Sequence, residues 1–169
     1  MKKIGIISDT HGLVDARYAH HFAECDEVWH AGDVGDYAVI EALRAIRPGI
    51  TVRAVAGNID GMDIRREFGD IQCFDVEGVH VWMTHICGYP GKYAPGVRPY
   101  LRKERPTLTV GGHSHILRVM YDNEFETLYV NPGAAGYHGW QKVRTLVRLT
   151  IDGSQIKDLE VIELSRDKA

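Results

Sequence analysis

The sequence has 169 residues, of which 44% are hydrophobic and 25% are charged, and its formal net charge is −3 at pH 7. This length suits one domain, residues 1–169, whose core buries roughly 70% of the surface of the extended chain. The small net charge and the lack of a Lys/Arg run give no indication of a nucleic-acid-binding face. No apolar stretch approaches the length of a membrane span, so we expect no membrane partner.

Three cysteines, Cys25, Cys73 and Cys87, stand far apart and form no C-x-x-C pair. This spacing argues against a disulfide framework and against a cysteine zinc site, and it fits a reducing compartment. The first residues enter a strand-like run without the features of a signal peptide. We therefore expect a cytoplasmic protein that is a monomer or a small homo-oligomer.

The first half of the chain alternates predicted strands and helices. Apolar runs predict strands at residues 3–8, 27–30 and 51–56. Residues 13–23 predict a helix, and residues 36–47 predict a second helix, because their apolar side chains recur on one face until a Pro-Gly pair follows. This order predicts βαβ units and a mostly parallel sheet.

The second half of the chain predicts hairpins. The paired strands are expected at residues 71–76 with 79–84, 117–121 with 127–130, and 143–151 with 156–164, and a further strand is expected at 108–111. Residues 88–99 are rich in Pro and Gly and predict a loop. The expected fold class is α/β (α+β), with two sheets packed face to face as a β-sandwich flanked by helices.

Five short polar motifs each follow a predicted strand. They are D-T-H at residues 9–11, G-D-V-G-D at 32–36, G-N-I-D at 57–60, T-H at 84–85 and G-H-S-H at 112–115. In α/β sheets, ligands gather beyond the carboxyl ends of the strands, where a rigid scaffold holds the loops. We therefore expect the five motifs to meet at one site.

The motifs supply nitrogen and oxygen donors without sulfur. The donors are two carboxylates, one amide and four imidazoles, from Asp9, Asp33, Asn58, His11, His85, His113 and His115. Such a set suits Mn, Fe, Zn or Ni better than Ca or Mg. Seven donors exceed the needs of one tetrahedral site. They match two metals that share a carboxylate, an arrangement that clamps a phosphoryl group for in-line displacement.

In this order the motifs resemble the calcineurin-like metallophosphoesterase family, in particular its small single-domain phosphodiesterases related to the retromer scaffold subunit. An Asn-Pro-Gly turn at residues 131–133 and the closing strands extend the likeness over nearly the whole chain. The resemblance implies the metallophosphoesterase fold and two divalent metal ions, with manganese expected and Fe, Zn or Ni as alternatives. It also implies a hydrolase that acts on a small-molecule phosphoester, with a phosphodiester favoured.

The resemblance also assigns ligands. It implies that one metal is held by Asp9, His11, Asp33 and His115. The other metal would be held by Asp33, Asn58, His85 and His113, so that Asp33 bridges the pair. A bridging hydroxide would then be the nucleophile, because two cations lower its pKa. We expect the catalytic residues to be Asp33, Asn58 and His85, with Asn58 also binding substrate and helping to stabilise charge in the transition state.

Two positions depart from the wider family. Many larger members have a histidine after the motif asparagine that assists the leaving group, whereas this chain has Ile59, which cannot donate a proton. Small members generally lack that histidine too. After His85 the usual glycine is replaced by Ile86, which implies a differently shaped rim. In the following loop Lys92 and Arg98 are candidate contacts for a substrate phosphate, the alternative being solvated side chains.

Several other polar residues have two interpretations each. Asp36 fits a helix N-cap or a residue that orients a ligand. Asp60 likewise fits a cap or a catalytic role. His30 is either a supporting residue behind the ligands or a partly buried strand residue, and His138 lies in a loop that could reach the site.

Two other functions stay open. The chain could be a phosphomonoesterase or a nucleotide hydrolase with the same metal centre. It could instead be a non-catalytic protein-binding scaffold of the same fold, like the retromer subunit. Because every expected His and Asp ligand is present, the sequence favours the enzyme.

Overall fold

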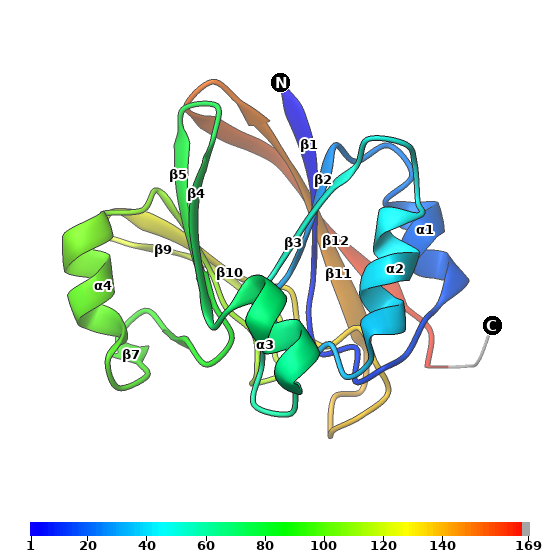
Figure 1. Cartoon of the computed structure of the whole chain (residues 1–169). Helices are drawn as coiled ribbons and strands as arrows, with labels where there is room; N and C mark the ends of the chain where they lie inside the picture. The colour runs from blue at the N-terminus through cyan, green and yellow to red at the C-terminus, as the bar shows by residue number, and fades with distance from the viewer. Residues whose placement is uncertain (167–169) are drawn as a thin grey trace.

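The computed structural model describes residues 1–166 and places two five-stranded sheets face to face (Figure 1). The first sheet has the order β12-β11-β1-β2-β3, formed by Gln155–Leu164, Arg144–Asp152, Lys2–Ile7, Glu27–His30 and Thr51–Ala54. The second has the order β4-β5-β8-β10-β9, formed by Ile71–Val76, Val79–Thr84, Leu108–Val110, Thr127–Asn131 and Arg118–Asp122. This arrangement confirms the predicted two-sheet fold class.

Each sheet contains three neighbouring parallel strands. β1 pairs in parallel with β2, and β2 with β3, while β11 and β12 close the first sheet in antiparallel register. In the second sheet β5, β8 and β10 are parallel to one another, and β4 and β9 are antiparallel edges. The carboxyl ends of the parallel strands therefore point to one end of the sandwich, where loops from both sheets meet.

Alternating side chains along the strands divide the interior into layers. Ile4 and Ile6 of β1 and Trp29 of β2 face the second sheet, where they meet Val81 and Met83 of β5. The intervening strand residues face the helices on the outer surface of the first sheet. These helices are α1 (Ala16–His21), α2 (Tyr37–Arg44) and α3 (Met62–Phe68).

The helix α4 (Val97–Glu104) lies on the opposite flank of the molecule, outside the second sheet (Figure 1). Its buried side chains Val97 and Leu101 pack on Trp82 of β5. The prediction that residues 88–99 form a loop was wrong at its C-terminal end, because the helix begins at Val97. Pro99 fits the first turn, where no intrahelical hydrogen bond is lost. The loop also contains the short hairpin β6 (Gly88–Tyr89) and β7 (Lys92–Tyr93).

The other predicted elements match the structure closely, including the β4–β5 hairpin and the first two helices. Asp36 is an N-cap, as one interpretation predicted, because its Oδ1 accepts a hydrogen bond from Ala38 N at 2.8 Å. Asp60 is not a cap. The N-cap residue of α3 is Gly61, and no side chain caps this helix. The sequence did not predict α3 or α4.

Among residues 1–166, no helix has the length and apolar character needed to cross a bilayer.

A buried ion pair ties the first helix to the last sheet strands. Asp15 Oδ2 lies 2.9 Å from Arg144 Nη2, and the Arg144 side chain is fully buried. Arg144 Nε also donates to Ala135 O at 2.6 Å. Burial raises the pKa of Asp15, but hydrogen bonds from Arg17 and Arg144 outweigh it and hold the pKa far below its ordinary value. The pair therefore anchors the loop that follows β10.

Replacing Asp15 by Asn keeps a helix-capping side chain but leaves the Arg144 charge buried and unpaired. We expect the variant to lose about 3 to 5 kcal/mol of unfolding free energy at pH 7, measured by urea denaturation. The pKa of Asp15 is lower in the folded than in the unfolded state. The difference in unfolding free energy between variant and wild type should therefore shrink as pH falls below the unfolded-state pKa of about 3.9. The control is Asp152→Asn, which breaks an exposed pair with Lys157 and should hardly move the midpoint. An equally small effect of Asp15→Asn would contradict this role.

Candidate metal centre

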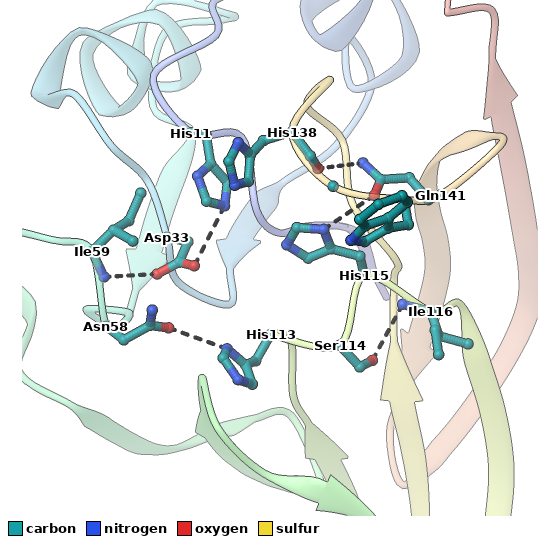
Figure 2. A pocket seen from close by; sticks show the side chains of 12 residues that line it. His11, Asp33, Asn58, Ile59, His113, Ser114, His115, Ile116, His138 and Gln141 are labelled. Carbon is teal, nitrogen blue, oxygen red and sulfur yellow. Dashed lines mark hydrogen bonds and ion pairs between the residues drawn. The ribbon is translucent and has the colours of Figure 1, made fainter.

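The structure brings all seven predicted ligand residues to the end of the sandwich where the parallel strands finish. Asp9 and His11 follow β1, Asp33 follows β2, and Asn58 follows β3. From the second sheet, His85 follows β5 and the two histidines of G-H-S-H follow β8. Figure 2 shows His11, Asp33, Asn58, His113 and His115 around one cavity, which these residues line. Asp9 and His85 are buried behind them.

The first group of donors is Asp9, His11 and His115, whose donor atoms lie within 4.8 Å of one another. Ser8 Oγ and His113 N donate to Asp9 Oδ2 at 2.5 and 3.2 Å. Asp9 Oδ1 lies 3.1 Å from His115 Nε2, but neither it nor the buried His11 Nε2 makes a hydrogen bond within residues 1–166. Unbonded polar atoms that face a common point are costly to bury, and a cation between them would remove that cost.

The second group of donors is Asp33, His85 and His113, and Asn58 lies beside it. His85 Nδ1 donates to Ala31 O at 2.7 Å, so its Nε2 presents a lone pair. That lone pair faces two oxygens, Asp33 Oδ2 at 3.2 Å and Asn58 Oδ1 at 3.1 Å. Asn58 Oδ1 also lies 3.1 Å from His113 Nδ1. These donors fit a divalent cation placed among them.

The Asp33 carboxylate lies between the two groups. Its Oδ2 is 3.4 Å from His11 Nε2 of the first group and 3.2 Å from His85 Nε2 of the second. Its Oδ1 accepts a hydrogen bond from Ile59 N at 3.1 Å (Figure 2). The carboxylate is therefore held in an orientation from which it can reach a metal in either group.

Five of the seven residues have the left-handed backbone conformation that non-glycine residues rarely adopt. The φ angles are +55° at Asp9, +47° at His11, +54° at Asp33, +71° at His113 and +63° at His115. Each such residue costs free energy, and such residues cluster at functional sites because the surrounding fold enforces them. The fold thus uses strained backbone to aim these side chains into the cavity.

Two glycines allow the backbone of the loops after β2 and β3 to pack directly against His85 and Asp33. At Gly32, where φ is +101°, an added Cβ would lie 2.6 Å from His85 Nδ1. At Gly57, an added Cβ would overlap both the carboxylate and the backbone of Asp33. Gly32 directly precedes Asp33 and Gly57 directly precedes Asn58 in the sequence, and the structure has no space for a side chain at either glycine.

Burial and neighbouring charges set the protonation of the centre. Burial raises the pKa of Asp33, but the hydrogen bond and the charge of His85 outweigh it and lower the pKa to about 2. Burial is the main cause that lowers the pKa of His11. An ionised carboxylate and a neutral imidazole are the forms that bind metals. Burial lowers the pKa of His85, but Asp33 and Asp9 outweigh it and raise that pKa, and Asp9 raises the pKa of His115. Metal ions therefore compete with protons for these two imidazoles.

Asp60 organises the loops without facing the cavity. Its carboxylate accepts hydrogen bonds from the backbone of Val34, Gly35 and Gly57 at 3.1, 2.8 and 2.7 Å. It therefore ties the loop after β2 to the loop after β3, on which Asp33 and Asn58 lie. The supporting role suggested for His30 is also found: its ring is buried and bonds Thr10 Oγ1 and Gly32 N.

His138 and Gln141 complete the cavity from the loop after β10. The His138 ring stacks on His11 with ring centroids 4.4 Å apart. Gln141 Oε1 lies 3.1 Å from His115 Nδ1, which leaves His115 Nε2 facing Asp9. Gln141 Nε2 donates to His138 O at 2.7 Å (Figure 2). No sequence motif marked Gln141, because its role depends on a loop conformation that only the fold defines.

The two basic residues proposed for substrate binding are placed differently. Lys92 lines a smaller pocket that borders the cavity and shares His113 with it. Arg98 instead forms an ion pair with Glu124, and its guanidinium lies 5.3 Å from the centre of the Phe125 ring. The structure therefore brings Lys92 near the centre and does not bring Arg98 there.

The chain is similar in sequence to known proteins. The family model described as "Calcineurin-like phosphoesterase superfamily domain" matches residues 1–154. "Probable metallophosphoesterase MJ0623" of Methanocaldococcus jannaschii is 26% identical over 138 residues, which are 78% of this chain and 67% of that protein.

Two solved structures show the same fold at low identity. A protein described as a novel archaeal phosphodiesterase has a TM-score of 0.69 and 23% identity, over 96% of this chain and 99% of that chain. Vps29 of Entamoeba histolytica complexed with zinc has a TM-score of 0.74 and 15% identity, over 96% of this chain and 98% of that chain.

The close approach at Gly57 gives a direct test of the centre. Gly57→Ala should displace the Asp33 carboxylate and weaken the binding of Mn²⁺ by about 10- to 100-fold, measured by calorimetric titration. The control is Gly61→Ala, where the added Cβ would only touch Asp63 Oδ1 at 3.5 Å. Wild-type Mn²⁺ affinity in Gly57→Ala, with the fold intact by circular dichroism, would show that Asp33 does not bind metal.

Proposed function

This chain belongs to the calcineurin-like phosphoesterase superfamily, and on that premise we propose that it hydrolyses phosphodiesters with two divalent metal ions. One ion is held by Asp9, His11, Asp33 and His115, and the other by Asp33, Asn58, His85 and His113. The observation that carries the proposal is the position of Asp33 Oδ2, 3.4 and 3.2 Å from a histidine of each group. Manganese is the expected metal, and Fe, Zn or Ni also suit these donors.

Bound at this centre, the two metal ions supply an activated water and Lewis-acid stabilisation of the phosphoryl group. The residues of the chain position these components. Asp33 fixes the spacing between the two groups, and His85 is held by Ala31 O so that its Nε2 faces the centre. Asn58 lines the cavity. Its amide N–H group is the donor that we assign to a phosphoryl oxygen as charge develops there.

The lining of the cavity favours a diester over a monoester. Among the described residues that line it, none is Lys or Arg, so it offers no cationic side chain to a dianionic monoester. Instead, three exposed apolar side chains stand at its edge: Ile59, Ile116 and Trp140, which are 46%, 57% and 101% exposed. Exposed apolar groups beside a polar centre indicate a partner with an apolar part. We therefore assign an organic phosphodiester whose leaving group is apolar or aromatic.

The absence of a proton donor at Ile59 agrees with this substrate class. An aromatic alcohol leaves as a stable anion, so its departure depends little on a general acid. A substrate with a poor leaving group would need an acid that position 59 does not supply. We assign Lys92, which lines the adjoining pocket, to a distal part of the substrate.

A protein-binding scaffold is the second candidate, and the observation in its favour is the shared fold with Vps29. A scaffold has no need of the strained ligand residues or of the unbonded Asp9 and His11 atoms. Metal-dependent turnover therefore separates the two functions.

Replacing Asp33 by Asn tests the role of the shared carboxylate. We expect kcat/KM for bis(p-nitrophenyl) phosphate in the presence of Mn²⁺ to fall by at least about 100-fold, together with a loss of bound metal. The control is Asp36→Asn, three residues away, which preserves the cap of α2 and should retain activity. Unchanged turnover in Asp33→Asn would reject the proposed mechanism, and no turnover in the metal-loaded wild type would favour the scaffold.

Replacing Trp140 by Ala tests the apolar rim. We expect kcat/KM for a bis-aryl phosphodiester to fall by about 10-fold, because an apolar contact of this kind discriminates by roughly that factor. The value of kcat/KM for a methyl aryl phosphodiester should fall by a similar factor, because its leaving group is the same aryl alcohol. Val161→Ala, an exposed apolar residue on β12, is the control. A loss confined to the bis-aryl substrate would show that Trp140 contacts the ester group that stays on phosphorus, and no loss on either substrate would show that the apolar rim does not bind the leaving group.

A further inference from the structure

A second cluster of metal-binding side chains lies on the outer surface of the second sheet. Phe74 of β4 and Val81 of β5 face the core between the sheets. Because side chains alternate along a strand, Cys73 of β4 and His80 of β5 face outward. There they meet Glu104, the last residue of α4.

The three donor atoms of this cluster are nearly equidistant. Cys73 Sγ lies 3.4 Å from His80 Nε2 and 3.4 Å from Glu104 Oε2. His80 Nε2 and Glu104 Oε2 are also 3.4 Å apart. Three ligands on a tetrahedral zinc ion, at about 2.0 to 2.3 Å from the metal, lie roughly 3.3 to 3.8 Å from one another. The existing separations therefore leave a place for one ion with little movement of the side chains.

A fourth residue orients the histidine. Asp75 is paired directly with His80 across the β4–β5 hairpin, and its Oδ1 lies 2.5 Å from His80 Nδ1. When Nδ1–H donates to this carboxylate, the lone pair of Nε2 faces Cys73 and Glu104. Histidines that bind metals in proteins usually have such a partner on the other ring nitrogen.

We propose that Cys73, His80 and Glu104 bind one Zn²⁺ ion, with a water molecule as the fourth ligand. A set with one sulfur, one nitrogen and one oxygen donor suits zinc better than manganese or magnesium. Binding converts the Cys73 thiol to a thiolate and releases its proton to solvent. The three side chains are exposed or half-exposed, so the ion can enter from water.

This zinc site is distinct from the proposed phosphoesterase centre. His80 is the second residue of β5 and His85 follows the last, which places them about 16 Å apart along the strand. The zinc joins the β4–β5 hairpin to the end of α4, which follows the loop that contains Lys92. The zinc ion would therefore hold α4 against the second sheet. It would also stabilise the side of the Lys92 pocket that precedes α4 in the chain.

Titration of the whole chain with Co²⁺ tests the site, because cobalt replaces zinc and reports a bound thiolate. We expect a strong near-ultraviolet thiolate-to-cobalt charge-transfer band in the wild type and in Asp33→Asn, since the phosphoesterase centre contains no sulfur. Cys73→Ser should lose the band, while the control Cys25→Ser should keep it. No band in the wild type, or a band that persists in Cys73→Ser, would overturn the proposal.

Affinity for Zn²⁺ in the same variants provides a second test. Asp75→Asn should weaken binding at this site by about 10- to 100-fold, and Glu104→Gln should weaken it at least as much. The matched control is Glu41→Gln, an exposed glutamate on α2. Competition with a chelator dye measures the affinity in the Asp33→Asn background. Unchanged affinity in both site variants would overturn the proposal, whatever the chain hydrolyses.

Discussion

The candidate centre depends on where the Asp33 carboxylate is held. Asp33 follows a short buried strand, adopts a left-handed backbone conformation and receives the backbone N–H of Ile59 on one oxygen. The other oxygen is thereby left between His11 and His85, which come from different sheets. The packing of the two sheets thus sets the distance between the two groups of donors, and the proposed two-metal chemistry rests on that distance.

The strained ligand loops are stable because the structure behind them is rigid. Asp60 binds three backbone N–H groups of the loops that contain Asp33 and Asn58. The buried Asp15–Arg144 pair anchors the loop that supplies His138 and Gln141. Charges that would be costly in an apolar core are in this way placed where they hold the loops that surround the cavity.

The sequence predicted most of the strands and the meeting of seven polar residues at one end of the sandwich. The strands were predictable because apolar alternation and turn residues are local signals, as the β4–β5 hairpin shows. The seven residues were predictable because each lies in a short motif at a strand end. The short helices α3 and α4 were not predicted. The start of α4 lies in a Pro/Gly-rich segment that is typical of a loop, and α4 is stabilised by packing on Trp82.

Other features of the site depend on contacts between distant segments. Gln141 acts through His115, and Cys73 meets Glu104 only because α4 crosses the outer face of the second sheet. The absence of a C-x-x-C pair argued against a zinc site in which cysteines are the main ligands. That argument does not apply to a site with one cysteine, one histidine and one glutamate. Local spacing is therefore a good guide to motifs that lie at strand ends and a poor one to clusters that the fold assembles.

Electron paramagnetic resonance of the Mn²⁺-loaded chain tests the shared Asp33 carboxylate most directly. Two Mn²⁺ ions that share the Asp33 carboxylate are close enough for their spins to couple. We expect an exchange-coupled signal in the wild type, which Asp33→Asn should convert to an uncoupled one. A six-line spectrum of isolated Mn²⁺ in the fully loaded wild type would contradict the shared carboxylate and, with it, the proposed dinuclear centre.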